Sequence, residues 1–260
     1  MGKKFVYFAF FILLLSIIAA YFMSVKLIRS IDNFGINTIN AYVSDFCHPD
    51  LPVFDTRDFP WSKTLRDNWK LIRDEYIDYV KNHKVPYYRQ LDNSGAANAD
   101  LSKFPKWRAL ILRAWNKDSD VMKSFPVTKG LLKNTGYVLA KFSIIEPWGK
   151  LIPHIGFYKG VLRYHLTLVA PQRWRNCYLT VNGTKLYWKE GEDILFDDLF
   201  IHQVDNLTNE TRVVLFLDIP RPFHNIFMDS INIFLLSIAQ YNERVQRIIK
   251  SINEFAAANK

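Results

Sequence analysis

Hydrophobic and polar positions divide the chain into stretches with three kinds of pattern. Residues 5–23 form an uninterrupted run without a charged side chain. Between residues 58 and 79, apolar side chains recur at three- and four-residue steps, which predicts an amphipathic helix. Residues 137–219 show short apolar runs separated by turn residues, and after Pro222 a helical spacing returns. The sequence therefore predicts a mainly β protein with flanking helices.

The first apolar run is long enough to cross a membrane. A transmembrane helix needs about 20 apolar residues, whereas the apolar core of a cleaved signal peptide, the alternative, has about 7–15. We therefore expect an N-terminal transmembrane helix that makes the protein a single-pass membrane protein. It would occupy residues 1–30, and a tether would follow over residues 31–56. Basic residues flank both ends of the run, so its orientation stays open.

Residues 57–135 are expected to form a helical and irregular part of the folded domain. The amphipathic helix would bury one stripe of side chains, formed by Trp61, Leu65, Trp69, Ile72, Tyr76 and Tyr79. The polar residues 83–104 predict a loop. Residues 107–115 fit a strand or a short helix, and residues 125–133 predict a further helical turn.

Residues 136–222 carry the β pattern. Five strands are expected, at Tyr137–Ile145, Val161–Val169, Cys177–Val181, Ile194–Phe196 and Arg212–Ile219. Asn182-Gly183 between two apolar runs is a good hairpin signal. Short strands with tight turns are typical of a sandwich or jelly roll. No alternation of strands and helices occurs, so a doubly wound parallel sheet is not expected.

Residues 223–260 predict one amphipathic C-terminal helix. Its apolar stripe would consist of Phe227, Ile231, Phe234, Leu235, Ile238, Tyr241, Val245, Ile248, Ile252 and Phe255. Such a stripe can be removed from water by packing on the domain, by a contact between two copies of the chain, or by the membrane interface. Packing on the domain is the preferred interpretation.

Composition narrows the functional classes. A chain of 260 residues suits one enzyme-sized domain with appendages. The formal net charge of +9 suits anionic lipid headgroups or acidic small ligands. The sequence has no zinc-finger spacing, helix-turn-helix signal or RNA-binding signature, so nucleic acid is not expected as a partner. Two cysteines, Cys47 and Cys177, are too few for a disulfide framework.

Basic side chains in the β region predict an acidic ligand. Along a strand over residues 161–169, alternation places Arg163, His165 and Thr167 on the face opposite four apolar residues. Arginine binds carboxylates through two hydrogen bonds and stays charged when buried. Because Arg212 begins another strand, two inward arginines favour an acidic small molecule.

His154 and His202 are the candidate metal ligands, since neutral imidazole suits iron, copper or zinc. His154 is expected in a turn just before a strand, and His202 follows Asp197-Asp198. A zinc hydrolase is a weaker alternative, because no third ligand or general base has the expected spacing.

The ordered motifs of residues 137–222 resemble the aspartyl/asparaginyl β-hydroxylase family. They are His154-Ile155-Gly156, Leu162-Arg163-Tyr164-His165-Leu166, Phe196-Asp197-Asp198 with His202, and Arg212-Val213-Val214-Leu215. The resemblance implies an Fe(II)- and 2-oxoglutarate-dependent dioxygenase, with O₂ as the other cosubstrate, on a double-stranded β-helix (jelly-roll, cupin-like) core. Motifs at 65–69, 72–73 and 218–222 are similar to the bacterial lipid A 2-hydroxylases, membrane-bound members that hydroxylate an acyl chain.

Site roles follow by position from this resemblance. His154 and His202 would ligate iron. Gly156 stands where most related oxygenases have a carboxylate ligand, and the resembled family also has glycine there.

The same resemblance implies a cosubstrate site. Arg212, helped by Ser143, would bind the distal carboxylate of 2-oxoglutarate. Arg163 and His165 would hold the end of 2-oxoglutarate nearest the metal.

Three functions compete at this point. The chain would hydroxylate a membrane lipid acyl chain, or Asp and Asn residues of a protein substrate, or it would be a non-catalytic jelly-roll binding module. Phe157-Tyr158-Lys159 replaces a Pro-containing turn common among the protein hydroxylases, which weakens the case for a peptide substrate. Glycosylation sequons begin at Asn182, Asn206 and Asn209 and matter only in a secretory lumen.

Overall fold

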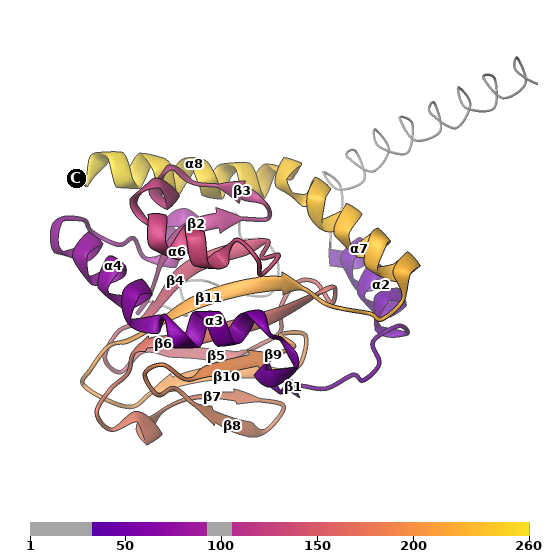
Figure 1. Cartoon of the computed structure of the whole chain (residues 1–260), viewed down its shortest axis with the longest axis horizontal. Helices are drawn as coiled ribbons and strands as arrows, with labels where there is room; N and C mark the ends of the chain where they lie inside the picture. The colour runs from indigo at the N-terminus through magenta and orange to yellow at the C-terminus, as the bar shows by residue number, and fades with distance from the viewer. Residues whose placement is uncertain (1–32, 93–105, 260) are drawn as a thin grey trace, which may run out of the picture.

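The protein is built around two antiparallel β-sheets, with helices gathered around the larger one (Figure 1). The structure is a computed structural model that describes residues 33–92 and 106–259. The larger sheet has seven strands in the order β1-β9-β6-β11-β4-β2-β3, and the smaller sheet has four in the order β5-β10-β7-β8.

The strands of the larger sheet are β1 (Val53–Phe54), β2 (Trp107–Ala114), β3 (Lys117–Asp118), β4 (Leu139–Ile145), β6 (Val161–Val169), β9 (Asp193–Phe196) and β11 (Arg212–Pro220). Those of the smaller sheet are β5 (Lys150–His154), β7 (Cys177–Val181), β8 (Thr184–Tyr187) and β10 (His202–Asn206). The α-helices are α2 (Asn33–Ser44), α3 (Trp61–Asp67), α4 (Trp69–Asn82), α5 (Tyr88–Leu91), α6 (Pro126–Leu132), α7 (Ile226–Ile238) and α8 (Glu243–Ala258).

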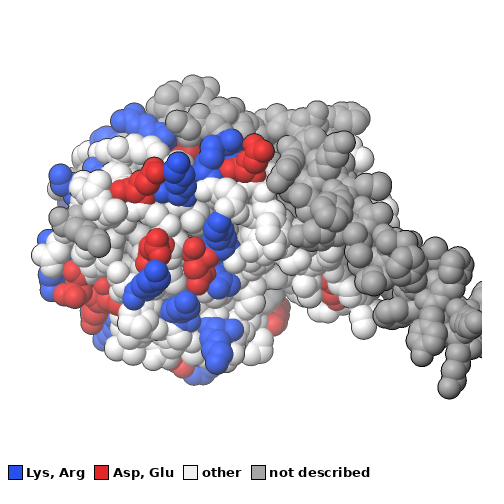
Figure 2. All heavy atoms as spheres, turned by 90° about the horizontal axis from the view of Figure 1, so that it is seen from above, with Lys and Arg blue, Asp and Glu red and all other residues white. Residues whose placement is uncertain are grey.

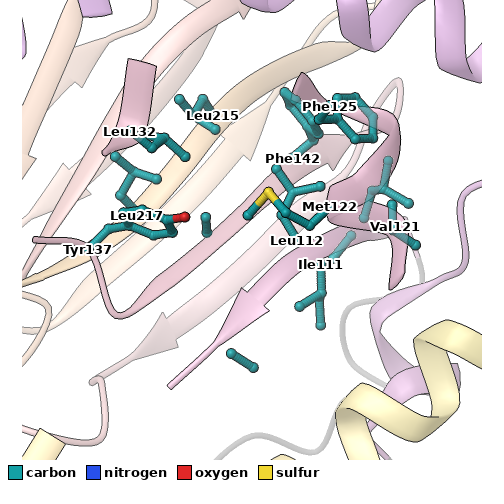
Figure 3. Packing of buried hydrophobic residues seen from close by; sticks show 14 of the residues in the cluster. Ile111, Leu112, Val121, Met122, Phe125, Leu132, Tyr137, Phe142, Leu215 and Leu217 are labelled. Atoms are coloured by element: carbon teal, nitrogen blue, oxygen red, sulfur yellow. The ribbon is translucent and has the colours of Figure 1, made fainter. Parts of the chain in front are cut away.

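One face of the larger sheet forms the main hydrophobic core with the helices. The predicted alternation along β6 is confirmed, because four alternate side chains lie fully buried in this core: Leu162, Tyr164, Leu166 and Leu168. Figure 3 shows Phe125 and Met122 beside Phe142 and Leu112, so the segment after β3 closes the core over β2 and β4. The other face of the larger sheet packs against the smaller sheet.

A second apolar cluster fills the space between the two sheets. It combines Phe196 and Phe216 of the larger sheet with Leu179 and Val204 of the smaller one, together with the fully buried Trp188. Polar side chains on the inner face of β6 and β11 therefore point into a closed interior.

The predicted mainly β architecture is confirmed, but five strands of the structure were not predicted: the two-residue strands β1 and β3, and β5, β8 and β10. Four of the five residues of β10 are polar, β8 has only four residues, and Leu151 is the one buried residue of β5, so these strands show no clear alternation of apolar and polar residues. Residues 107–114 form a strand and not a helix. The Asn182-Gly183 hairpin is confirmed between β7 and β8, with φ of 46° and 82°, as a tight two-residue turn requires.

The helices also differ from prediction. The helix expected over residues 58–79 is two helices, α3 and α4, which meet at Asn68. The segment expected as a tether contains α2 and β1, and Val43 and Cys47 are buried against the domain. The single C-terminal helix expected is divided into α7 and α8, because Asn242 caps α8 by accepting a hydrogen bond from the Arg244 backbone N–H.

No helix within residues 33–92 and 106–259 is both long and apolar enough to cross a bilayer. The anchor predicted over residues 1–30 lies outside the described residues, as does most of the loop predicted over residues 83–104. On the face shown in Figure 2, lysine and arginine are interspersed with aspartate and glutamate.

Candidate functional site

Two histidines from neighbouring strands of the smaller sheet lie side by side. His154 ends β5, His202 begins β10, and the two residues pair in register. Their ring centroids are 4.2 Å apart. Contrary to the expected turn, His154 belongs to a strand, and this strand brings together two residues that are far apart in sequence.

Each of these histidines is oriented by its own backbone. Nδ1 of His154 lies 2.7 Å from the Ile152 carbonyl oxygen, and Nδ1 of His202 lies 3.0 Å from the Phe200 carbonyl oxygen. A carbonyl only accepts, so both Nδ1 atoms carry the proton. Nε2 is then the nitrogen that each ring offers to a metal ion.

Burial keeps both rings neutral. It lowers the pKa of His154, and the cations Arg163 and Lys141 add to that effect. It lowers the pKa of His202 to about 3, with the neighbouring His154 as the next cause. A metal ligand must be the unprotonated imidazole, and neutral rings meet this requirement at neutral pH.

A carboxylate occupies the space that a side chain at Gly156 would need. A Cβ atom on Gly156 would lie 1.8 Å from Oδ2 of Asp198, and the Gly156 N–H donates to the Asp198 carbonyl at 2.6 Å. Within the described residues, no group of three or more His, Cys, Asp or Glu side chains is placed to hold a metal ion. The histidine pair therefore stands without a third protein ligand there.

Asp198 is buried with Arg163 and was not predicted as a site residue. Arg163 Nη2 lies 2.8 Å from Asp198 Oδ2, but neither oxygen of Asp198 has a partner in hydrogen-bonding geometry. Burial raises the pKa of Asp198 to about 7, against the opposing effect of Arg163. Asp198 follows the β9 strand, and only the fold shows that it faces Gly156.

Arg163 lies between two carboxylates. Besides Asp198, it bonds Asp218 of β11, with Nε 2.9 Å and Nη2 3.1 Å from the two carboxylate oxygens. Burial alone would lower the pKa of Arg163, but the charges of both acids raise it above its ordinary value. Arg163 lies on the inner face as predicted, and two acids already share its charge.

Arg212 and Ser143 meet at the other end of the interior. Arg212 is almost fully buried, donates from Nη1 to the Ser143 carbonyl at 3.0 Å, and lies over the Trp188 ring, 4.2 Å from its centroid. Its Nε has no hydrogen-bond partner. The Ser143 hydroxyl accepts from Trp107 Nε1 at 3.0 Å. Burial lowers the pKa of Arg212 to about 10, against the opposing effect of Cys177, so the group is charged at neutral pH.

His165 lies on the same strand face as Arg163. Its ring is 4.9 Å from the Phe216 ring and 5.3 Å from the Phe196 ring, centroid to centroid. Neither ring nitrogen has a hydrogen-bond partner. Burial, followed by the charges of Arg212 and Arg163, lowers the pKa of His165 well below its ordinary value. A neutral His165 thus offers one donor and one acceptor to a ligand.

Lys141 is a further cation in the interior that sequence reasoning missed. It lies on β4, is 4% exposed, and has its ammonium group 3.9, 4.8 and 4.9 Å from the ring centroids of Phe216, Trp107 and Tyr88. Burial lowers its pKa to about 7. The sequence contained a signal for this interior cation. Lys141 stands two positions before Ser143 in a mostly apolar strand, so alternation puts both side chains on the same face.

Exposed apolar side chains flank the histidine pair. Ile155 follows His154, and Ile201 precedes His202, so the antiparallel register makes these isoleucines neighbours. Both are exposed, as is Phe157. We call these three residues the apolar rim.

The side chains present fit the metal and cosubstrate that the sequence predicts. Buried polar atoms without partners are rare in folded proteins and often mark a ligand site. Among the described residues they belong to His165, Thr167, Thr180, Trp188, Asp198 and Arg212. A buried arginine with an unused donor suits a carboxylate, and two neutral imidazoles suit a divalent transition metal.

The fold makes one of the predicted glycosylation sequons inaccessible. Asn206 is fully buried, and its amide donates to the carbonyl oxygens of Glu146 and Glu210 at 3.1 and 2.8 Å. A glycan on this nitrogen is incompatible with the folded chain, whereas Asn182 and Asn209 are exposed.

Comparisons with known proteins support one family. The model of the family described as aspartyl/asparaginyl beta-hydroxylase matches residues 66–222. The ornithine lipid ester-linked acyl 2-hydroxylase of Rhizobium tropici is 32% identical over 174 residues, which are 66% of this chain and 61% of that protein. The aspartyl/asparaginyl beta-hydroxylase of Homo sapiens is 30% identical over 168 residues, 62% of this chain and 21% of that protein. The matched part thus spans less than two thirds of either relative.

Solved structures share only a remote likeness. A cupin domain of an XRE-family transcriptional regulator from Enterobacter cloacae superposes with a TM-score of 0.32 at 9% identity, over 45% of this chain and 99% of that chain. This similarity is too weak to compare sites.

Proposed function

Because the chain belongs to the aspartyl/asparaginyl β-hydroxylase family, we propose that it is an Fe(II)- and 2-oxoglutarate-dependent dioxygenase that hydroxylates the acyl chain of a membrane lipid. The observation that carries the proposal is the pair of carbonyl-anchored histidines, His154 and His202, beside a closed interior that contains Arg212. The relatives supply the reaction class, and the residues of this chain supply the binding groups.

Each group has a defined task in this proposal. His154 and His202 would hold iron through Nε2. The Phe196 ring, 5.5 Å from the His202 ring between centroids, would limit the access of water to the metal. The Arg212 guanidinium would bind the distal carboxylate of 2-oxoglutarate beside Ser143, and burial strengthens this charge pair. Iron, 2-oxoglutarate and O₂, when bound, would supply the oxidising chemistry needed to hydroxylate an unactivated C–H bond.

Arg163 and His165 would orient the part of the cosubstrate nearest the metal. Arg163 is fixed by Asp218, so its planar group is held in one orientation before a ligand enters. His165, neutral and without a partner, would donate or accept a hydrogen bond without changing the charge of the site.

The apolar rim supports a lipid substrate. Ile155, Phe157 and Ile201 expose hydrocarbon beside the histidines, which suits an acyl chain better than a polar peptide. The name of the Rhizobium tropici relative refers to acyl 2-hydroxylation. The mammalian relatives favour the second candidate, hydroxylation of Asp or Asn residues in a protein.

The test is ligand binding followed by turnover. The full chain in detergent is titrated with Fe(II) and 2-oxoglutarate without oxygen, and succinate is measured in air with an ornithine lipid, a lipid A or a peptide. Lipid-stimulated succinate supports the proposal, and peptide-stimulated succinate supports the second candidate. His202→Ala should abolish metal binding, whereas His224→Ala, on an exposed residue, should not. A folded chain that binds neither ligand would be a binding module and not an enzyme.

A further inference from the structure

Helix α7 exposes an apolar face that no described part of the chain covers. Phe227 and Phe234 are 77% and 45% exposed, and Ile226 and Ile233 are 77% and 59% exposed. In its 13 residues the only charged side chain is Asp229, and Asp229 is turned to the loop before the helix, where it accepts from the Phe223 N–H at 2.8 Å. A surface helix normally turns a polar face to water, so this face is unusual.

The orientation of α7 is fixed from its other side. Met228 and Leu236 are buried in an apolar cluster with Tyr158 and Phe223. The fully enclosed Asn232 accepts from the Tyr158 hydroxyl at 2.9 Å and donates to the Gly160 carbonyl at 2.8 Å. Rotating the helix to hide its phenylalanines would break these buried bonds. The exposed face is therefore a permanent feature of the folded chain.

Helix α7 lies beside α2, the first described helix after the N-terminal apolar run. Helices α2 and α7 contribute to the same apolar cluster and lie together at one end of the molecule (Figure 1). Helix α2 begins at Asn33, ten positions after Met23, the last residue of the run. Ten residues span at most roughly 35 Å even when fully extended. A membrane that holds the run is thus within reach of α7.

The same end of the molecule carries the histidine pair. Phe157 of the apolar rim lies three positions after His154, and its carbonyl accepts from the Asn40 side chain of α2 at 3.0 Å. The next residue, Tyr158, bonds α7 through Asn232. The short segment that leaves the metal-ligand strand is therefore bonded to α2 on one side and to α7 on the other.

We infer that the exposed face of α7 lies in the interface of the lipid bilayer and holds the apolar rim at the membrane surface, where an acyl chain can reach the histidines. This inference rests on the proposed membrane-lipid function and adds the surface that orients the protein. Aromatic and aliphatic side chains on an uncharged helix face suit the boundary between headgroups and acyl chains. A water-facing role for the same residues would leave a continuous apolar patch in solvent.

Depth-dependent fluorescence quenching tests the orientation in the full chain. The Phe234→Cys variant is labelled with an environment-sensitive dye and reconstituted into phosphatidylcholine–phosphatidylglycerol liposomes that contain a lipid with a nitroxide on its acyl chain. Cys47 and Cys177 are buried and should not react with the dye. Tyr187→Cys on β8 is the matched control, because this aromatic residue is 37% exposed and lies on the smaller sheet. Phe227→Cys is the second labelling site if the first variant fails to fold.

The expected result is a blue-shifted emission that the nitroxide lipid quenches at the α7 site, with a severalfold smaller loss of emission at the control site. A blue shift without lipid quenching would mean that a second copy or another segment of the chain covers α7, which overturns the inference. A chain that floats with the liposomes but shows equal quenching at both sites overturns it too, while membrane attachment stands. If the chain does not float with the liposomes, both the proposed membrane location and this inference are wrong.

Discussion

Lys141 allows the cost of a buried charge to be measured in this protein. Its side chain is 4% exposed, and Asp218 and Asp198 act on it only as neighbouring charges that oppose the fall in its pKa. Burial, followed by the charge of Arg163, lowers its pKa from 10.5 to about 7. At 1.36 kcal/mol per pKa unit, this difference corresponds to about 5 kcal/mol of destabilisation when the lysine is fully protonated.

The direction of the pH dependence follows from proton binding. Between about pH 7 and about pH 10.5 the unfolded chain binds this proton more tightly than the folded chain, so the free energy of unfolding rises with pH. Below pH 7 the lysine is charged in both states, and the destabilisation is complete and constant. At pH 7 about 4 kcal/mol of it is present, because half of the folded molecules carry the proton.

The aromatic rings around the ammonium offset part of this cost. Phe216, Trp107 and Tyr88 surround it at 3.9 to 4.9 Å, and such contacts contribute about 1–2 kcal/mol together. Lys141→Met keeps the side-chain length and removes the charge, so we expect it to stabilise the metal-free protein by about 2–3 kcal/mol at pH 7. For a chain of this size that is a rise in Tm of about 4–12 °C.

The assay is thermal unfolding of the full chain in detergent with a metal chelator, at pH 7 and at pH 10. The stabilisation by Lys141→Met should shrink to within about 1 kcal/mol at pH 10, where the wild-type lysine is neutral when folded. Lys84→Met, on an exposed lysine, should leave Tm unchanged at both pH values. A variant that is less stable than wild type at pH 7, or equally stabilised at both pH values, would refute the reasoning, because the ammonium would then have a stabilising partner.

Three further predictions use other parts of the site. Gly156→Ala should lower both Tm and metal affinity, because its Cβ would lie 1.8 Å from a carboxylate oxygen of Asp198, whereas Gly130→Ala, in helix α6 with open space around its Cβ, should raise Tm slightly and leave metal affinity unchanged; equal Tm values for the two variants would contradict this. Asn206→Ala should lower the free energy of unfolding by about 3 kcal/mol in a denaturant titration, since buried carbonyls and the Thr208 hydroxyl lose their partner; a loss below about 1 kcal/mol would mean that water replaces the amide. Because burial lowers the pKa of both paired histidines, competition between protons and Co(II) in equilibrium dialysis should begin at a lower pH for the protein than for free imidazole; the same midpoint for both would show that burial does not protect the rings.

The sequence predicted those parts of the fold whose pattern is local. Alternation along residues 161–169 placed Arg163 and His165 on the inner face, because a strand fixes the direction of successive side chains. The strand that carries His154 was missed, since four of its five residues are at least partly exposed and its sequence shows no apolar alternation. The outer face of β5 does not contribute to any core, so no hydrophobic signal existed there.

The long-range contacts of the site were beyond sequence reasoning. Asp198 was seen only as part of an acidic pair, and its position against Gly156 depends on two loops that meet in space. Lys141 and Ser143 share a strand face, but the aromatic rings around Lys141 come from three other elements. The division of the C-terminal region at Asn242 was readable as a helix cap, although the continuous apolar spacing outweighed it.

The way in which the two histidines are oriented has a consequence for how such a site can change during evolution. Each Nδ1 is held by the carbonyl two residues earlier in its own chain segment, at Ile152 and at Phe200. The protonated nitrogen is thus chosen by local backbone, and no side chain from another element is needed to choose it. Substitutions in the walls of the interior leave the metal-binding tautomer intact, so the ligand pair is a self-contained unit. In this chain, the walls of the interior can therefore change without changing which nitrogen of either histidine carries the proton.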